Sequence, residues 1–550
     1  MNAITTIEQA YKDFLTTHYQ LESAAFDAGT FALNSNPSKK AFGDASSNSA
    51  LVIARLRKLT PQTVAREIIL AFRHDDIERL EIAGPGFINF FFKPAVWHTI
   101  ATTISTQKDA FFSEHTGNHQ GLYSIEYVSA NPTGPLHFGH GRGGIIGDVL
   151  ANVLTYLGYK VNREYYINDA GGQMQKLARS LKIRCQQAIG MEAQLNEESY
   201  HGEYIIDLAK ACIQEHGNAV VDRDEAFFEE YGKQTMLTAI KETMDSYGIT
   251  FDTWFSEKTL HTSGAITEAL ERLQKAGHLY DLDGATWFRS TAFGDDKDRV
   301  VRKSDGELTY ASADIAYMLN KIDRGATNLV MILGHDHHSY AMRLDSIRRA
   351  LGLDEVELDV ILYQLVKMKT NGEMVRMSKR AGNIVTLKDI IDTVGKDVAR
   401  FFFLNRKADA QLDFDLNLAL TKSDENPVFY LHYAYVRTNS IFTKANEHEA
   451  LRDVTVADSA SMDDEDRALI RKIVELKSVL NGISTSMQTH LLAYYALELA
   501  QQFHAYYGKN KIIDAENVAA SRARLFVVGL THEALDRILT LLGLSQPKKM

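Results

Sequence analysis

Apolar and polar positions divide the chain into three blocks with different periodicities. In the first, residues 1–105, the apolar positions of ASSNSALVIARLRKLTPQTVAREIILAF recur at helical spacing, and Pro61 is a favoured first residue for the second helix. The next stretch, IERLEIAGPGFINFFF, alternates and then turns at Gly84-Pro85-Gly86, as a β-hairpin does. We therefore expect a small α+β domain at this end of the chain.

The second block, residues 115–425, has the pattern of a parallel sheet. GLYSIEYVSA predicts a strand, IIGDVLANVLTYLGYK a helix that ends at Gly158, and VNREYYIND the next strand. This βαβ unit opens a doubly wound, Rossmann-like sheet. NLVMILGHDHH and DVILYQLVKMK predict two more buried strands, whereas residues from about 175 to 290 are mostly helical in pattern and are expected to form an insertion.

The third block, residues 426–550, has helical periodicity with few glycines or strand signals. It predicts an α-helical bundle. The whole chain is thus expected to be an α/β multidomain protein, in which a doubly wound parallel-sheet domain follows an N-terminal α+β domain and precedes the bundle.

Composition narrows the class of protein. The chain has 550 residues, of which 45% are hydrophobic and 24% charged, with a formal net charge of −11. No apolar run reaches the roughly 20 residues of a membrane span, so no membrane association and a cytoplasmic location are expected. The acidic balance disfavours non-specific coating of nucleic acid but allows a local basic surface. Cys185 and Cys212 form no CxxC pair, which disfavours a zinc knuckle or a disulfide framework.

Candidate chemistry begins with ANPTGPLHFGHGRGG, residues 130–144. Gly139 leaves room for a flat ring against the backbone, and His137 and His140 are one turn apart at the start of a helix. Helix N-termini attract phosphate, and imidazoles can donate to phosphate oxygens in a transition state. Taken alone, the motif is equally consistent with two helix-start histidines in a glycine-rich turn.

A second segment, EMVRMSKRAGN at 373–383, is basic and follows a predicted strand. A loop that carries Lys379 and Arg380 could close over a triphosphate and stabilise the leaving pyrophosphate. By itself, MSKR is more often a solvated charge pair. The order of the two segments is what makes the nucleotide interpretation specific.

HxGH followed by MSKR resembles the paired signatures of the class I aminoacyl-tRNA synthetases. EYVSANPTGPLHFGHGRG, YYINDAGGQ, MSKRAGN and NPVFYLHYAYVR together resemble the arginyl-tRNA synthetase family of the bacterial type, as do the segments GDASSNSA, GPGFINFFF and LLGLSQPKKM. The resemblance covers nearly the whole chain. It implies ATP-dependent ligation of L-arginine to tRNA(Arg) through an arginyl-adenylate, which supplies protein synthesis.

The resemblance also implies roles for single residues at the ATP end. Arg376 stands where the family has the first lysine of its second signature. Some arginyl enzymes without that lysine carry one ahead of the first signature, but the corresponding position here is Gly134, so Arg376 is expected to serve instead. The residues implied in catalysis are His137, His140, Lys379 and Arg376, and those implied in ATP binding are His137, Gly139, His140, Gly334, Asp336, Met377, Ser378 and Lys379.

Arginine recognition needs carboxylates that match a guanidinium fork. Tyr310 and Asp314 match family positions that clasp the guanidinium, and Glu126 and Asn131 match positions at the α-amino and carboxyl groups. His335 stands where some relatives carry glutamine, and it completes the implied arginine site. Three residues of INDAGGQ are expected either to line this pocket or to cap the following helix: Asn168, Asp169 and Gln173.

The implied partners are tRNA(Arg), L-arginine and ATP with Mg²⁺, with no tightly bound cofactor, no protein metal site and a monomeric chain. In the helical tail, Tyr433 and Arg437 are the residues most expected to be exposed and to contact the anticodon, because aromatic and arginine side chains stack on splayed bases. The rings nearby are Phe429, Tyr430 and Tyr435, and most of these rings are equally explained as core. The N-terminal domain is implied to touch the outer corner of the tRNA, and arginine activation to wait for bound tRNA.

Other functions share parts of this pattern. A cysteinyl enzyme would normally show zinc-ligand cysteines, a glutamyl enzyme should have a basic pocket, and a lysyl enzyme remains possible within the class. A small nucleotidylyltransferase also uses HxGH but lacks MSKR and a helical tail. A non-catalytic tRNA-binding paralogue is disfavoured by the intact His137, His140 and Lys379.

Overall fold

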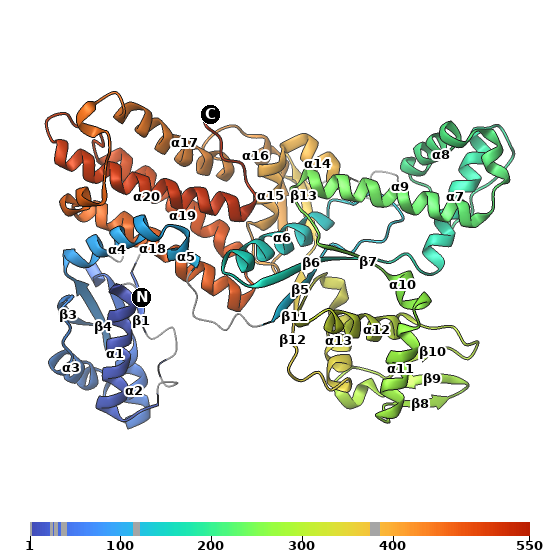
Figure 1. Ribbon diagram of the computed structural model, residues 1–550, viewed down its shortest axis with the longest axis horizontal. Helices are drawn as coiled ribbons and strands as arrows, with labels where there is room; N and C mark the ends of the chain where they lie inside the picture. The colour runs from blue at the N-terminus through green and yellow to red at the C-terminus, as the bar shows by residue number, and fades with distance from the viewer. Residues whose placement is uncertain (1–2, 23–25, 27–30, 35–40, 114–120, 375–384) are drawn as a thin grey trace.

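The computed structural model describes residues 3–22, 26, 31–34, 41–113, 121–374 and 385–550 (Figure 1). Its N-terminal domain packs α1 (Ala3–Tyr19), α2 (Ser49–Arg57) and α3 (Pro61–Ala71) with an antiparallel sheet of order β1-β2-β4-β3. These strands are β1 (Phe31–Leu33), β2 (Ala45–Ser47), β3 (Ile77–Ala83) and β4 (Phe87–Phe92). The predicted hairpin is the β3–β4 pair, and the Thr60 side chain caps α3 directly before Pro61. Helices α4 (Pro94–Gln107) and α5 (Asp109–Ser113) lead onward.

The central sheet is parallel throughout and has the strand order β12-β11-β5-β6-β7. It contains the predicted βαβ unit, made of β5 (Leu122–Glu126), α6 (His140–Tyr156) and β6 (Lys160–Ile167). The chain continues to β7 (Thr253–Ser256) on one side of β5 and returns to β11 (Ala326–Gly334) on the other. The strand order therefore reverses between β5 and β11, which is where doubly wound sheets bind ligands.

The segment between β6 and β11 contains more strands than its helical pattern indicated. Helices α7 (Gly172–Ala188), α8 (Glu203–His216) and α9 (Glu225–Ser246) form a projecting unit with a core of its own (Figure 1), in which Cys185 and Cys212 are buried. β7 then joins the central sheet. After α10 (Glu257–Thr262) and α11 (Ala265–Lys275), a second antiparallel sheet is formed by β8 (Leu279–Leu282), β9 (Ala285–Phe288) and β10 (Arg299–Arg302). The helices α12 (Tyr310–Asp323) and α13 (His338–Ala350) flank β11 in sequence.

The expected strand DVILYQLVKMK is two strands in different sheets. β12 (Glu357–Tyr363) is the edge of the central sheet, whereas β13 (Val366–Thr370) pairs with β14 (Glu373–Met374) and β15 (Leu412–Asp415). The break falls at Gln364, whose backbone N–H donates to Ala408 and whose carbonyl accepts from the buried Arg142. Periodicity alone does not reveal such a break, because the side chains on both sides of it are apolar.

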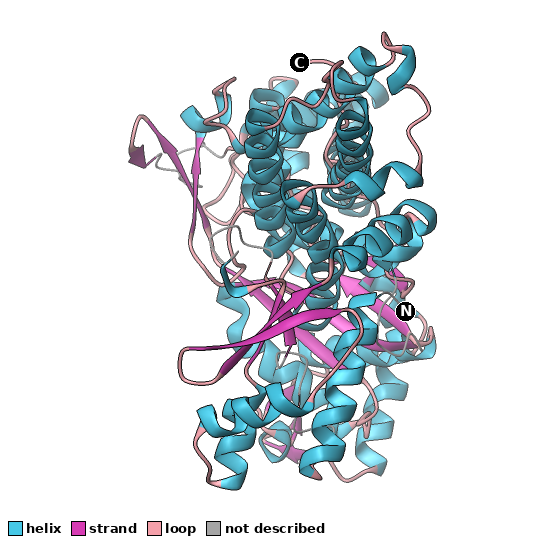
Figure 2. Ribbon diagram, turned by 90° about the vertical axis from the view of Figure 1, so that its left-hand side faces the viewer, coloured by secondary structure: helices cyan, strands magenta, loops and turns pink. Residues whose placement is uncertain are grey.

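The C-terminal part is helical, as predicted. α14 (Leu387–Val394), α15 (Lys396–Leu404) and α16 (Leu416–Leu420) lead into a bundle of α17 (Pro427–Ala445), α18 (Asp464–Ser486), α19 (His490–Lys509) and α20 (Val518–Leu542). Figure 2 shows the central strands in the middle of the molecule, with the bundle above them and further helices below. Within the described ranges, no helix is both long enough and apolar enough to cross a bilayer.

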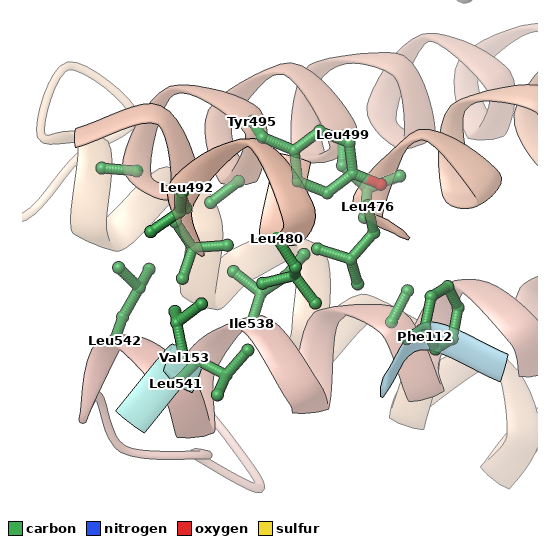
Figure 3. Close-up of a cluster of buried hydrophobic side chains, with 14 of the residues drawn as sticks. Phe112, Val153, Leu476, Leu480, Leu492, Tyr495, Leu499, Ile538, Leu541 and Leu542 are labelled. Atoms are coloured by element: carbon green, nitrogen blue, oxygen red, sulfur yellow. The ribbon is translucent and has the colours of Figure 1, made fainter. Parts of the chain in front are cut away.

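The bundle shares a hydrophobic core with the central domain (Figure 3). Val153 of α6 packs among Leu480, Leu492 and Ile538, which come from three helices of the bundle, and Phe112 of α5 extends the same cluster. The helix that begins at the HxGH motif is therefore fixed to the C-terminal bundle by burial of apolar surface.

Candidate functional site

A cleft of about 990 Å³ opens at the carboxyl ends of β5 and β11. It is lined by residues that are distant in sequence, which the reversal of strand order brings together. The lining includes these residues expected from the sequence: Glu126, Asn131, His137, Gly139, His140, Asn168, Tyr310, Asp314, Gly334 and Asp336.

The His137 and His140 rings lie against each other, tilted, in the lining of the cleft. Their ring centroids are 3.7 Å apart and the ring planes meet at 32°. The His137 Nδ1 accepts a hydrogen bond from the Gly139 N–H at 3.0 Å, and a Cβ on Gly139 would approach the His137 ring to 2.9 Å. Gly139 thus allows the close approach of the His137 ring, and it is also the N-cap of α6, without a side chain to occupy the helix N-terminus.

Two further glycines of α6, Gly143 and Gly147, allow close packing of the helix. A Cβ on Gly143 would lie 2.6 Å from the Tyr363 ring, and a Cβ on Gly147 would lie 2.3 Å from the Tyr127 ring. Both distances are far below van der Waals contact. The glycine-rich sequence therefore lets α6 lie directly against aromatic side chains that follow β5 and end β12, and so places the histidines at the sheet edge.

The residues of the second signature, Arg376, Met377, Ser378 and Lys379, lie outside the described residues. The residues that follow residue 384 contact the first signature. The Phe138 N–H donates to the Val385 carbonyl at 3.1 Å, and the Leu387 N–H donates to the Leu136 carbonyl at 2.8 Å. The chain that follows residue 384 is therefore hydrogen-bonded to the segment that contains His137.

Asp314 also lines the cleft. Its carboxylate accepts a hydrogen bond of 2.8 Å from the Tyr340 hydroxyl and a longer one of 3.4 Å from Arg343 Nη1. Burial raises the pKa of Asp314 to about 6, and the hydrogen bond from Tyr340 and the charge of Arg343 oppose this rise. Tyr310, one helical turn earlier, lines the same cleft but is 59% exposed, so it lies near the entrance.

Glu126 is held by a buried ion pair. Lys321 Nζ lies 2.6 Å from Glu126 Oε2, and the Ser129 hydroxyl donates to Glu126 Oε1 at 3.1 Å. Directly after β5, Val128 and Ser129 have φ values of 69° and 38°, which non-glycine residues rarely adopt. Such strain costs about 1–3 kcal/mol per residue and is typical of binding sites.

Sequence reasoning missed several side chains of the cleft, among them Tyr166, Glu257, Tyr340 and Arg343. Glu257 is 3% exposed, and its pKa is raised by burial and by the charge of Asp314, although contacts with Tyr166 and His261 oppose the rise. Its signal in the sequence is weak, because it is one acidic residue after TWFS in a stretch of helical pattern. Tyr340 and Arg343 follow β11 by about two helical turns, where no motif marks them.

Some expected residues lie elsewhere. His335 is exposed and is not among the residues that line the cleft. The buried Asp169 accepts hydrogen bonds from the Ser256 hydroxyl and the Lys258 N–H, so it binds the start of α10, whereas the N-cap of α7 is Gly171. Gln173 accepts a hydrogen bond of 2.8 Å from Asn131 Nδ2.

The C-terminal bundle presents a cluster of aromatic and cationic side chains. The Arg437 guanidinium lies 4.2 Å from the ring centroid of Tyr433 and 4.5 Å from that of Tyr507. The His504 ring stacks on Tyr433 at 5.5 Å. Tyr433 is 45% exposed, whereas Tyr435 is buried and donates to Asp536. Tyr433 is therefore exposed, Arg437 is half-buried against its ring, and Tyr435 belongs to the core.

Comparison with known families agrees with this architecture. Residues 3–92 match the arginyl tRNA synthetase N-terminal domain, residues 102–413 the catalytic domain of the class I (R) tRNA synthetases, and residues 431–550 the DALR anticodon-binding domain. The chain belongs to the arginyl-tRNA synthetase family. The arginine–tRNA ligase of Shouchella clausii is 42% identical over 520 residues, which cover 94% of this chain and 93% of that protein. That of Anoxybacillus flavithermus is 40% identical over 557 residues, with all of both chains covered.

Solved structures of the arginyl-tRNA synthetase family have the same fold. A Campylobacter jejuni structure described as an arginyl tRNA synthetase has a TM-score of 0.76 and 32% identity, and it covers 84% of this chain and 100% of its own. The Thermus thermophilus arginyl-tRNA synthetase has a TM-score of 0.74 at 19% identity, with 99% and 100% covered. The predicted family, fold class and arginine–tRNA ligase activity are confirmed, whereas the glutamyl, cysteinyl and lysyl alternatives are not supported. The catalytic domain is of the class that uses ATP, and the bundle is an anticodon-binding domain.

Proposed function

We propose that this cleft activates L-arginine with ATP and then transfers it to tRNA(Arg). In the first step, an oxygen of the arginine carboxylate attacks the α-phosphorus of ATP, and the bond to the leaving pyrophosphate breaks. In the second, a terminal ribose hydroxyl of the tRNA attacks the mixed anhydride and releases AMP. The observation that carries the proposal is one cleft that is lined both by a pair of imidazoles and by nearly buried carboxylates.

At the ATP end, His137 and His140 donate to phosphate oxygens as negative charge builds up in the transition state. Gly334 and Asp336 lie at the end of β11, where they can contact the ribose. Lys379, with Arg376, Met377 and Ser378, is proposed to contact the triphosphate. The hydrogen bonds between residues 136–138 and 385–387 support this proposal, because they tie the end of that segment to the histidines.

At the arginine end, Asp314 and Glu257 are the acceptors proposed for the guanidinium. Two carboxylates with raised pKa values gain most from a cation that replaces the lost hydration with hydrogen bonds. Glu126 and Asn131 are proposed to bind the α-amino and carboxyl groups, and Tyr310 to cover the side chain near the entrance. An uncharged analogue would leave the buried carboxylates unpaired, which explains selectivity for arginine.

Partners follow from the same site and from the bundle. Tyr433 and Arg437 are proposed to contact the anticodon of tRNA(Arg), because the Tyr433 ring is exposed and the Arg437 guanidinium lies against it. Mg²⁺ would accompany ATP and would be held mainly by phosphates and water. Among the described residues, no group of three or more His, Cys, Asp or Glu is placed to hold a metal ion. The cytoplasmic location, the monomeric state, the domain boundaries, the contact of the N-terminal domain with the tRNA and the dependence of activation on tRNA remain predictions.

A charging assay tests the proposal. The purified chain, given total tRNA and each of twenty labelled amino acids in turn, should charge tRNA with arginine alone. Asp314→Asn should raise the KM for arginine at least tenfold, since a charge-assisted pair is worth more than 1.4 kcal/mol. Asp323→Asn removes an exposed carboxylate from the same helix and should leave the KM unchanged. Equal KM values for the two variants would show that the guanidinium binds elsewhere.

A further inference from the structure

A cation of the protein itself lies against the carboxylate proposed to receive arginine. Tyr340 and Arg343 are three residues apart on α13, so they share one face of the helix, and both reach Asp314 of α12. Arg343 lines the cleft, and its side chain is 21% exposed. A guanidinium of the protein thus occupies part of the site that a substrate guanidinium needs.

The charges around Asp314 show what this cation does. Of the carboxylates that line the cleft, those of Glu126, Glu257 and Asp314 are nearly buried. Lys321 pairs with Glu126, and Arg343 pairs with Asp314. Without Arg343, Asp314 would face two other carboxylates in a poorly solvated site, and like charges in such a site favour protonation. A protonated carboxyl group is a much weaker acceptor for a guanidinium.

The hydrogen bonds around Asp314 leave room for a ligand. Arg343 uses one nitrogen at 3.4 Å, near the outer limit of a hydrogen bond, and Tyr340 uses the other carboxylate oxygen at 2.8 Å. An ionised carboxylate has about four acceptor positions, so roughly two remain. This matches the two parallel N–H groups of a guanidinium fork.

We propose that Arg343 is a positioning residue for arginine recognition, which keeps the Asp314 carboxylate charged and holds it with its free acceptor positions toward the cleft. The inference rests on the proposed function of the site. The titratable and charged groups that face Asp314 are Glu126 from β5, Tyr166 from β6, Glu257 from α10, and Tyr340 and Arg343 from α13.

The test is the pH dependence of kcat/KM for arginine, measured by pyrophosphate exchange with saturating ATP and tRNA. Because burial raises the pKa of Asp314 to about 6 and Arg343 opposes the rise, kcat/KM should fall as the pH drops through 6. In Arg343→Gln the midpoint should move upward by about one pH unit, so that the loss is several-fold larger at pH 6 than at pH 8.5. Arg343→Lys should restore most of the wild-type midpoint, because it keeps the charge.

The matched control is Arg349→Gln, which removes an exposed guanidinium from α13 that pairs with Asp345 and does not line the cleft. Its profile should equal that of the wild type. Arg343→Ala is a second neutral variant, and the pH profile of whichever of the two neutral variants folds tests the role of Arg343. A midpoint that stays at the wild-type value in the neutral variants would overturn the role of Arg343, as would a loss of equal size at every pH.

The variant Asp314→Asn separates a failure of the proposed function of the site from a failure of the role proposed for Arg343. If it leaves the KM for arginine unchanged, the proposed function of the site fails, and the role of Arg343 fails with it. If it raises the KM while Arg343→Gln leaves the midpoint unchanged, only the role of Arg343 is overturned.

Discussion

Lys321 and Glu126 form an ion pair of 2.6 Å in which both side chains are almost completely buried. Lys321 follows Asp314 by seven residues on α12, which is two helical turns, so both project from one face of that helix. One helix therefore supplies the carboxylate proposed for the guanidinium and the cation that orients the carboxylate proposed for the α-amino group. Helix α12 therefore sets the distance between the positions proposed for the guanidinium and for the α-amino group of arginine.

Replacing Lys321 should cost both stability and arginine binding. Lys321→Met leaves Glu126 as a buried charge without its cation, which should lower the free energy of unfolding by about 3–5 kcal/mol and raise the KM for arginine. Urea denaturation measures the first effect and pyrophosphate exchange the second. Adding Glu126→Gln should recover part of the stability but none of the binding. An unchanged unfolding free energy in Lys321→Met would mean that the pair is not buried.

Asp314→Asn should stabilise the free protein while it weakens arginine binding. Because the folded pKa of Asp314 is raised to about 6, the folded state binds more protons than the unfolded state between about pH 4 and 6. The penalty for ionising this carboxyl group therefore appears as the pH rises through that window and is complete at pH 7. The substitution Asp314→Asn removes this penalty, so it should raise the free energy of unfolding by about 1–3 kcal/mol at pH 7. Thermal unfolding at pH 4 and pH 7 checks this: a gain at pH 4 as large as that at pH 7 would contradict the assigned ionisation.

The close packing of α6 predicts opposite effects for two glycine substitutions. Gly147→Ala would push a Cβ into the Tyr127 ring, so α6 must shift. The variant should therefore lose about 1–3 kcal/mol of stability, and also activity. Gly482→Ala, near the C-terminal end of α18, has no atom within 4 Å of the added Cβ and should gain about 0.5–1 kcal/mol of stability. Equal stabilities would show that α6 does not approach Tyr127 so closely.

The exposed cluster on the bundle predicts a defect confined to tRNA binding. Tyr433→Ala and Arg437→Ala should each raise the KM for tRNA about tenfold, because stacking on one base contributes about 1–3 kcal/mol, and should change the KM for ATP little. Lys275→Ala removes a similarly positive, highly exposed side chain far along the chain from the bundle and serves as the control. A KM for tRNA that rises equally in Lys275→Ala would indicate a general charge effect.

Much of the architecture follows from local patterns in the sequence. The βαβ unit, the β3–β4 hairpin and the helical bundle were predictable because their apolar periods are long and uninterrupted. The strands β7, β8 and β9 were not, since each has four residues, too few for a period to show among neighbouring helices. Gln364, where β12 ends, interrupts an apolar run that continues into another sheet.

The site was predictable only where residues belong to a motif. His137, His140 and Asp314 lie in motifs that resemble a known family, and the structure brings them into one cleft. Arg343 lies in a helix with two more arginines, Arg348 and Arg349, and nothing in the sequence distinguishes it from them. Its role depends on a hydrogen bond between two helices, which only the folded arrangement defines.

The most direct test of the account is a crystal structure with a non-hydrolysable arginyl-adenylate analogue. We expect the guanidinium within hydrogen-bond distance of Asp314, the α-amino group beside Glu126, and the phosphate beside His137 and His140. A guanidinium bound away from Asp314, or a nucleotide bound away from the two histidines, would contradict it.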